Sequence, residues 1–266
     1  MYSKNIFLGM LVIPVILSGC GEADTELVSD ASVSKKVSIE QKAEPEVLVS
    51  QHGQAAASLQ TFAEEAPTAS AGPLDVPLLL QMAEPQLYNG CEVTSLAMIL
   101  NYHGYETTKN ELAQKVPRVP LTYENGLKGN PNQGFVGDMV DGPGLTVYNG
   151  PIYDLARQYT GDRAVNLTGQ PIEKVYENIA QGLPVWVITT VNYQPVNDFR
   201  TWETPSGKVQ VTFSVHSVVV TGYDKDYVYL NNPYGVKNQK VHRDAFEKAW
   251  EQMGSQAIVI KHKPVS

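Results

Sequence analysis

The residues from Lys208 to Pro233 constrain the fold of this chain more than any other segment. They comprise two runs, "KVQVTFSVHSVVVTGY" and "YVYLNNP", which are rich in the β-branched and aromatic residues that favour strands. The polar residues around Asp224 and Lys225 separate the runs and are typical of a hairpin turn. The segment therefore predicts antiparallel strands that belong to a sheet.

Helical patterns come before this segment, and two more strand patterns flank it. Val93, Leu96 and Leu100 recur at the spacing of one helix face, and Gly104 follows as a stop. Short helices are further predicted over residues 108–116, 151–159 and 171–182, and strands over 184–191 and 256–262. Helices followed by a mainly antiparallel sheet predict an α+β domain, in which the helical half packs on the sheet.

The N-terminal part of the chain differs in composition from the rest. Residues 1–20 carry one lysine, an apolar run and a cysteine after small residues, which is the pattern of a signal peptide. A membrane-spanning helix needs about 20 apolar residues, and this apolar run is shorter. Residues 21–72 are rich in Ala, Ser, Glu and Gln and are predicted to form a disordered, acidic tether. The folded domain is expected to occupy residues 73–266.

The end of the signal peptide, "LSGC", resembles the lipobox of bacterial lipoproteins. This resemblance implies that Cys20 is lipidated and becomes the first residue of the mature chain. We therefore expect the protein to be lipid-anchored to a bacterial cell membrane, on its extracytoplasmic face. The alternative is an ordinary secretory signal in which the cysteine has no role.

The charge and the motif content exclude several classes of partner. The net charge is −8 and the isoelectric point is about 5.2, so the basic surface that binds nucleic acid is missing. The sequence has no glycine-rich phosphate loop, no paired cysteines and no His-Glu-x-x-His pattern, so neither a cofactor nor a metal is expected. We expect the protein to act as a monomer.

Only two cysteines occur in the sequence, and a lipidated Cys20 would leave Cys91 as the single thiol. Exported proteins usually pair their cysteines in disulfides, so a single thiol calls for an explanation. Cys91 directly precedes the apolar helical pattern and is expected at a helix N-terminus, where partial positive charge lowers the pKa of a thiol. We interpret Cys91 as a nucleophile; the alternative is a small side chain packed in the core.

A cysteine nucleophile needs a base, and the sequence has five histidines. His103 is expected about 18 Å from Cys91 on the same helix, which is too far for proton transfer. His216 interrupts a strand of valines and is either a core histidine or the base. The other three are predicted to lie in the tether, in the C-terminal tail and at a helix start: His52, His262 and His242. His216 is therefore the candidate base.

Two further residues complete this set. Folding the strands about the predicted turn brings Asn232 level with His216 or diagonal to it, and an amide oxygen can hold one imidazole tautomer. Asn232 could equally be a turn residue before a proline. An oxyanion donor is expected upstream of the nucleophile, from Gln81 or Gln86. We favour Gln81 because it ends the strand-like run "VPLLLQ", which would fix its position.

Together these residues resemble the papain-like cysteine peptidases, and among them the bacteriocin-leader-processing (double-glycine) peptidases and an exported lipoprotein subgroup. The order Gln, Cys, His, Asn matches, and so do the contexts "NGCEVTSLAMILNYHG", "HSVVVTGYD" and "NNPYG". The similarity covers residues 75–257. It implies the papain-like fold, with Cys91 as nucleophile, His216 as base and then acid, Asn232 as orienting residue and Gln81 in the oxyanion hole.

The resemblance also implies an activity, that of a cysteine peptidase which hydrolyses the bonds of a peptide or protein substrate through a thioester. The chain departs from the family at two points. Leader-processing members usually have aspartate at the position of Asn232, and the spacing from Gln81 to Cys91 is longer than in papain. No transporter segment is fused to the domain, so coupling to peptide export is not expected. Two alternatives stay open: a cell-wall peptide amidase with the same residues, and a peptide-binding module without turnover.

The segment from Tyr123 to Gly144 is long and rich in glycine. Long loops in compact domains are often functional, and we expect this one to line the substrate groove. Asp138 and Asp141 are candidates for selecting basic side chains of a substrate. The alternative is a solvated loop with surface acids.

Overall fold

The computed structural model describes residues 70–263 of the chain. The predicted signal peptide, the predicted lipidation of Cys20 and the predicted tether up to residue 69 lie outside the described residues. Among the residues that are described, no helix combines the length and the apolarity that a membrane crossing requires.

The described residues form five α-helices, a short 3-10 helix and ten strands. The helices are α1 (Cys91–Tyr102), α2 (Lys109–Lys115), α3 (Asn149–Thr160), η1 (Gly161–Arg163), α4 (Ile172–Ala180) and α5 (Arg243–Gln252). The strands are β1 (Arg118–Val119), β2 (Phe135–Val136), β3 (Ala164–Asn166), β4 (Val185–Thr190), β5 (Arg200–Thr204), β6 (Gly207–Val211), β7 (Val215–Tyr223), β8 (Tyr227–Asn232), β9 (Val236–His242) and β10 (Ala257–Ile260).

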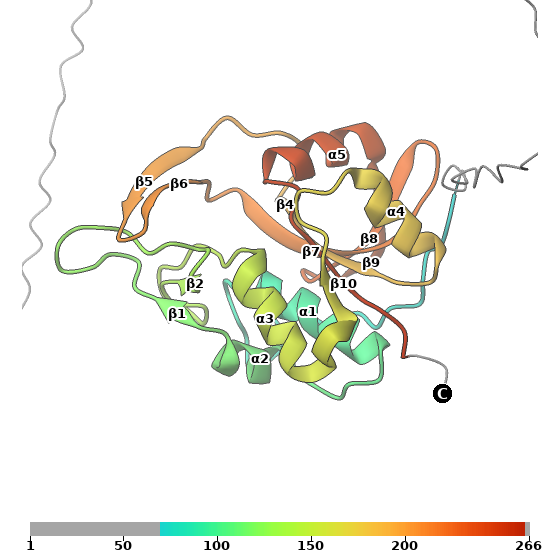
Figure 1. Ribbon diagram of the computed structural model, residues 1–266, viewed down its shortest axis with the longest axis horizontal. Helices are drawn as coiled ribbons and strands as arrows, with labels where there is room; N and C mark the ends of the chain where they lie inside the picture. The colour runs from blue at the N-terminus through green and yellow to red at the C-terminus, as the bar shows by residue number, and fades with distance from the viewer. Residues whose placement is uncertain (1–69, 264–266) are drawn as a thin grey trace, which may run out of the picture. The chain divides into compact units, whose positions relative to one another are not determined.

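Six of the strands form one sheet in the order β3-β10-β4-β7-β8-β9, and every neighbouring pair is antiparallel. In the view of Figure 1, α1, α2 and α3 lie below this sheet, whereas α4 and α5 lie above it. The short strands β1 and β2 pair in parallel, and β5 and β6 form a separate hairpin. The α+β class predicted from the sequence is therefore confirmed.

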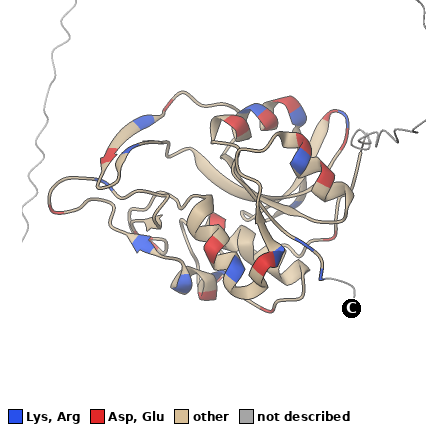
Figure 2. Cartoon of the chain, viewed as in Figure 1, with Lys and Arg blue, Asp and Glu red and all other residues tan. Residues whose placement is uncertain are grey.

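The side-chain pattern of the strands explains why helices cover both faces of the sheet. In β4, Val185 and Val187 belong to the core shared with α4 and α5, whereas Trp186 and Ile188 belong to the core shared with α1. Successive side chains of a strand point to opposite faces, so a strand that is apolar at every position must be covered on both sides. Figure 2 shows that charged residues lie on the helices and outer hairpins, whereas β4 and β7 carry none.

The central hairpin of β7 and β8 turns where the sequence predicts. The turn closes through a hydrogen bond of 2.8 Å from the Asp224 N–H. Val219 of β7 then pairs with Asn231 of β8. Continuing this register toward the open end of the hairpin places Asn232 diagonal to His216.

The prediction of one continuous strand over residues 208–223 is wrong, because the run is divided into β6 and β7. The hydroxyls of Thr212 and Ser214 donate to the Asp198 carboxylate at 2.6 and 2.9 Å. Such side-chain hydrogen bonds offer the backbone an alternative to the strand ladder. The sheet strand β7 therefore begins just before His216.

Helix α1 is buried on all sides rather than along one face. Residues 91–100 are all buried, and α1 packs against both β4 and β7. The Ser95 hydroxyl donates to the Ser217 carbonyl at 3.1 Å, and the Trp186 indole donates to the Glu92 carbonyl at 3.0 Å. These bonds fix the N-terminal half of α1 against the sheet.

Residues 72–90, which we call the arm, contain neither a helix nor a strand. The predicted strand-like run "VPLLLQ" is extended chain without a partner strand, so this prediction is wrong. Single hydrogen bonds hold the arm instead. The Leu74 N–H donates to the Thr221 carbonyl at 2.7 Å, and the Gln81 N–H donates to the Pro233 carbonyl at 2.8 Å. The arm therefore follows the β7–β8 hairpin before it leads into α1.

Candidate active site

Cys91 is the first residue of α1 and lies directly after the helix cap, Gly90. A Cβ at Gly90 would approach Leu87 to 2.6 Å, so glycine allows the arm to turn tightly into the helix. The Cys91 thiol is free and buried. The backbone of Ser217 hydrogen bonds with this thiol, and Ser217 is the neighbour of His216. The structure thus places the start of α1, which carries Cys91, against β7, which carries His216.

His216 is the second residue of β7 and is buried. Its Nε2 lies 3.0 Å from Oδ1 of Asn232. The Tyr234 N–H donates to the same oxygen at 3.0 Å, and a backbone N–H can only donate. The Asn232 atom that faces both groups is therefore the carbonyl oxygen, so the imidazole carries its proton on Nε2. Nδ1 has no hydrogen-bond partner among the described residues and is free to accept a proton.

The Tyr234 side chain covers the imidazole of His216. The two rings stack with centroids 4.7 Å apart and planes at 8°. Burial raises the pKa of Tyr234, and its electrostatic interactions with Cys91 and Glu92 raise it further, so the phenol also lies near the thiol. Sequence reasoning gave Tyr234 no role, although it follows Asn232 by only two residues, in the turn after β8.

A second layer of hydrogen bonds holds the Asn232 amide. Its Nδ2 donates to Oε1 of Gln239 at 2.9 Å. The hydroxyl of buried Tyr193 donates to the same Gln239 oxygen at 3.2 Å. The pairing of β8 with β9 is irregular between Leu230 and Asn232, where a bulge re-aims the side chain. Sequence reasoning missed Gln239 and Tyr193, because neither lies in a recognisable motif.

Burial sets the protonation states of Cys91 and His216. It raises the pKa of the Cys91 thiol well above its ordinary value, and the Glu92 carboxylate raises it further. Burial also lowers the pKa of the His216 imidazole to about 4, although the Asn232 hydrogen bond opposes the change. The lowered thiol pKa expected from the helix N-terminus is wrong, because desolvation outweighs the helix-end charge. The resting pair at neutral pH is therefore a neutral thiol and a neutral imidazole.

Glu92 follows the nucleophile and is fully buried. Its Oε1 accepts hydrogen bonds from the Thr146 hydroxyl and the Val147 N–H. Its Oε2 has no hydrogen-bond partner among the described residues, and burial raises the pKa of the carboxyl. Burial therefore makes the charged form of Glu92 less favourable than it is in water. Sequence reasoning gave this residue no role.

Gln81 and Gln86 both lie on the arm, but the hydrogen bonds of the site include only Gln81. Gln81 is buried, and its Nε2 donates to the Tyr88 carbonyl at 2.7 Å, just before Cys91. Gln86 is partly exposed. An amide nitrogen carries two protons, so Nε2 of Gln81 keeps a second donor for an oxyanion. The geometry thus favours Gln81, whose position is fixed by its own hydrogen bonds.

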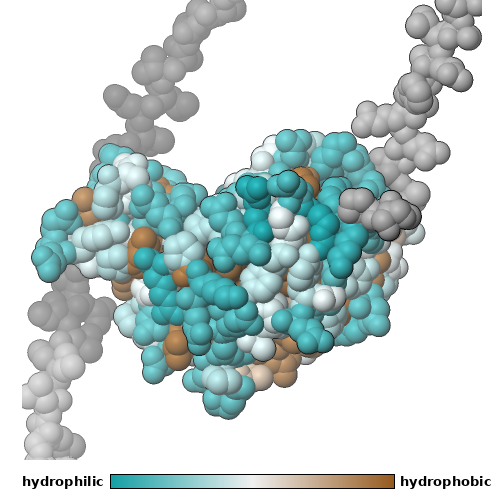
Figure 3. Space-filling model, turned by 60° about the horizontal axis from the view of Figure 1, so that its bottom comes forward, coloured by the Kyte–Doolittle hydropathy of each residue, from teal (hydrophilic) through white to brown (hydrophobic). Residues whose placement is uncertain are grey.

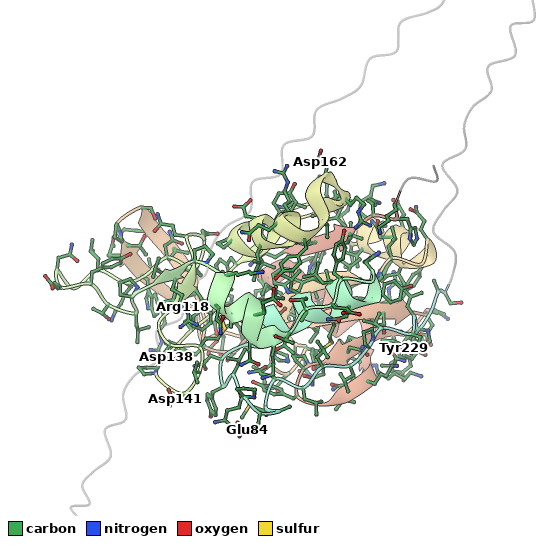
Figure 4. The ribbon with its side chains drawn as sticks, turned by 90° about the horizontal axis from the view of Figure 1, so that it is seen from below. Glu84, Arg118, Asp138, Asp141, Asp162 and Tyr229 are labelled. Atoms are coloured by element: carbon green, nitrogen blue, oxygen red, sulfur yellow. The ribbon has the colours of Figure 1, made fainter. Side chains whose placement is uncertain are left out.

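The glycine-rich loop borders the nucleophile through Asn89. The Asn89 amide donates to two carbonyls of this loop at 2.8 and 3.1 Å. Asp138 accepts the Val140 N–H at 2.7 Å, so this carboxylate is engaged within the loop, whereas Asp141 is exposed. Figure 4 shows both aspartates at the margin of the domain where Glu84 of the arm lies. The Asn89 hydrogen bonds hold the loop next to the residues that lead into α1, and its role in lining a substrate groove stays a prediction.

The groups that converge here are a thiol, an imidazole with a defined tautomer and two side-chain amides. These are the groups that nucleophilic acyl transfer by a cysteine requires. Within residues 70–263, no group of three or more His, Cys, Asp or Glu side chains is placed to hold a metal ion.

Comparison with known proteins identifies the family. The sequence profile described as "Peptidase_C39 like family" matches residues 73–258. The chain belongs to this C39-like family. The uncharacterized protein YvpB of Bacillus subtilis (strain 168) is 63% identical to this C39-like chain over 192 residues, which cover 72% of this chain and 77% of YvpB.

Solved structures also resemble this C39-like chain. The crystal structure of a candidate C39-like peptidase from Bacillus anthracis is 43% identical, with a TM-score of 0.68 over 71% of this chain and 96% of that one. Xylellain, a cysteine protease from Xylella fastidiosa, is 14% identical, with a TM-score of 0.40 over 74% of this chain and 87% of its own. The family match and the Bacillus anthracis structure confirm the resemblance to C39 peptidases that the motifs indicate.

Proposed function

We propose that this C39-like protein is a cysteine peptidase in which Cys91 is the nucleophile, His216 the base and then the acid, and Asn232 the orienting residue. One observation carries the proposal. The hydrogen bond between His216 Nε2 and Asn232 leaves Nδ1 as a free acceptor, on the strand whose next residue, Ser217, contacts the free and buried Cys91 thiol. Membership of a peptidase-like family supports the same reaction class.

The first half of the reaction forms a thioester. Nδ1 of His216 accepts the thiol proton while Sγ of Cys91 attacks the carbonyl carbon of the peptide bond. The carbonyl oxygen becomes an oxyanion, which the free N–H of Cys91 at the helix start and the Gln81 amide can stabilise. The imidazolium then protonates the leaving amine, the C–N bond breaks and the acyl group stays on sulfur. Because the pKa of His216 is about 4, its protonated form is a strong acid that favours this transfer.

The second half of the reaction hydrolyses the thioester. His216 Nδ1 accepts a proton from water while the water oxygen adds to the thioester carbonyl. The C–S bond then breaks, the proton returns to the sulfur and the carboxylic acid leaves. Asn232 holds the imidazole in place through both halves of the reaction. Its oxygen accepts a hydrogen bond from the Nε2–H group, and this bond is stronger when the ring is charged.

The place of action is also part of the proposal. The segment "LSGC" supports lipidation at Cys20 and anchoring at the outer face of a bacterial membrane. Growth with an alkyne fatty acid should label the wild-type protein, whereas Cys20→Ser should remain unlabelled and leave the membrane fraction. Labelling of both proteins would contradict this part of the proposal.

Labelling of intact cells with a membrane-impermeant, thiol-directed peptide probe tests nucleophile, base and location together. The wild-type protein should be labelled at Cys91, as mapped by mass spectrometry, and Cys91→Ala should lose the label. His216→Ala should be labelled far more slowly, and Gln86→Ala, the matched control, should behave as the wild type. Cleavage of a peptide library that Cys91→Ala leaves unchanged would contradict the proposal. Peptide affinity without any product from the wild type would instead support a binding module.

A further inference from the structure

Large apolar side chains that remain exposed are concentrated around the candidate active site. Eight such side chains occur in residues 70–263. Six of them form what we call the apolar rim: Leu80, Met82, Tyr88, Val140, Tyr234 and Val236, which are between 41% and 61% exposed. The face of the domain in Figure 3 is mainly hydrophilic, with hydrophobic residues in small separate groups.

Hydrogen bonds connect the first part of the rim to the nucleophile. Leu80 and Met82 flank Gln81, whose side chain donates to the Tyr88 carbonyl at 2.7 Å. The Tyr88 N–H in turn donates to the Val140 carbonyl at 2.8 Å. The arm and the glycine-rich loop therefore present their exposed apolar side chains beside the residues that lead into α1.

The second part of the rim follows the orienting residue. Tyr234 stacks on His216, and Val236 pairs with Asn232 at the start of β9. The two parts meet at Gly235, because Leu80 Cδ2 lies 3.5 Å from the Cβ position of that glycine. The rim therefore continues from the arm to the turn between β8 and β9.

The last two exposed apolar side chains lie at the same end of the sheet. Val191 follows β4 and donates from its N–H to the Ser214 carbonyl at 2.8 Å, and Phe213 precedes Ser214. Apolar surface that stays in water instead of being buried costs a free energy of about 25 cal/mol per Å². Clusters of exposed apolar side chains therefore mark interaction sites. The apolar rim combines exposed side chains from the arm, the glycine-rich loop and the turn between β8 and β9, which indicates a ligand with apolar side chains.

We propose that the apolar rim is a substrate-binding surface, and that the peptidase selects extended peptides with apolar side chains next to the bond that faces Cys91. This inference rests on the proposed function. The site also offers polar groups, because the first N–H groups of α1 have no intrahelical partner. A peptide backbone can hydrogen bond with such groups while its side chains cover the rim, whereas a lipid surface would leave them without partners.

Peptide binding to the full chain with Cys91→Ala tests this inference without turnover. Fluorescence anisotropy would compare a labelled octapeptide of Leu, Val and Phe residues with one in which these residues are Ser and Asn. The apolar peptide should bind about 10-fold more tightly or better. Adding Leu80→Asn and Val236→Thr should reduce this ratio to about threefold or less. Leu167→Asn, at a partly buried apolar residue after β3, is the matched control and should keep the full ratio.

The outcomes separate the inference from the proposed function. Equal affinity for both peptides, or an unchanged ratio in a Leu80→Asn/Val236→Thr protein that melts like the control, would overturn the inference. Wild-type cleavage of both peptides at equal rates would overturn it too, and would leave the peptidase proposal intact. A binding preference without any cleavage would contradict the peptidase proposal alone. If the Leu80→Asn/Val236→Thr protein lost binding to phosphatidylglycerol vesicles while its ratio of peptide affinities stayed unchanged, the rim would be assigned to a membrane. This result would also overturn the inference.

Discussion

The two sides of the candidate site are positioned by different means. His216 and Asn232 lie on the neighbouring strands β7 and β8, where ladder pairs with β4 and β9 fix them, and Gln239 adds a further hydrogen bond. Gln81 lies on the arm, which has no helix or strand and is held by separate hydrogen bonds, and the arm leads into α1 at Cys91. The proposed base and its orienting residue therefore depend on strand register, whereas the proposed oxyanion donor depends on a few separate contacts.

The largest expected effect comes from removing the reacting group on either side of the candidate site. Cys91→Ser and His216→Ala should each lower kcat/KM by about 10³-fold or more, because nucleophile and base act as a unit. His103→Ala is the control, since burial also lowers the pKa of His103 to about 4 and this histidine lies at the far end of α1. Peptide hydrolysis assays would measure all three. A similar loss in His103→Ala would show that the assay reports folding rather than chemistry.

The oxyanion donor on the arm gives the next largest effect. Gln81→Ala should lower kcat by about 10²-fold with little change in KM, because the interaction is made with the oxyanion and not with the resting substrate. Gln86→Ala, on the same arm, should retain the wild-type values. Steady-state kinetics of both variants decide between the two amides, and the reverse pattern would assign the donor to Gln86.

The burial of His216 on the sheet side predicts how stability depends on pH. The imidazole has a pKa of about 4 in the folded chain against about 6.5 when unfolded, so the unfolded state binds more protons between these values. The stabilising contribution is complete above about pH 6.5 and is lost as the pH falls toward 4. The free energy of unfolding, measured with urea, should fall between pH 7 and pH 4.5 by about 2–3 kcal/mol more in the wild type than in His216→Gln. Equal drops would contradict a buried, neutral His216.

Gln239 on β9 supports the side of the site that carries His216 and Asn232, because it accepts a hydrogen bond from the Asn232 amide. Gln239→Leu should lower kcat about 10-fold with KM unchanged, since the Asn232 amide would be free to turn. Gln239→Glu should restore activity, because a carboxylate oxygen still accepts the Asn232 N–H. Lys240→Ala, whose ammonium lies 3.7 Å from the Tyr227 ring centroid, is the control on the same strand. A loss in Gln239→Leu that Gln239→Glu does not restore would leave only a structural role.

The smallest expected effect concerns the loop beside the arm. Asp141→Asn should weaken any preference for peptides with Lys or Arg by about 2- to 5-fold, because an exposed carboxylate interacts weakly with a cation. Asp138→Asn should instead disturb the loop, as its carboxylate accepts the Val140 N–H. Competition between basic and neutral peptides would measure the preference. No change in Asp141→Asn would remove this residue from the substrate site.

The sequence predicts the ladder-held side of the site better than the arm. The β-branched residues and the turn near Asp224 fix the register of the hairpin, so counting residues leads from His216 to Asn232. Nothing local predicts the break between β6 and β7, because it depends on the Asp198 carboxylate. Gln239 was missed for the same reason, since its role depends on a bulge that only the pairing of β8 with β9 reveals.

On the arm, local patterns misled in two respects. The apolar residues of "VPLLLQ" favour a strand, yet they form chain without a ladder partner, and Val76, Leu78 and Leu79 pack against the core that includes α1. The helix N-terminus favours a lowered pKa at Cys91, whereas burial beside Glu92 raises it. Helix-end charge can be inferred from sequence spacing, but desolvation depends on neighbours that are distant in the chain.

Trapping the acyl intermediate tests the central claim most directly. An apolar peptide ester would be turned over by the full chain, quenched in acid within milliseconds to seconds and mapped by mass spectrometry. The account predicts an acyl mass on the peptide that carries Cys91, its absence in Cys91→Ala and its much slower formation in His216→Ala. Steady cleavage of the ester with no acyl group on Cys91 at any quench time, or undiminished cleavage by Cys91→Ala, would contradict the account.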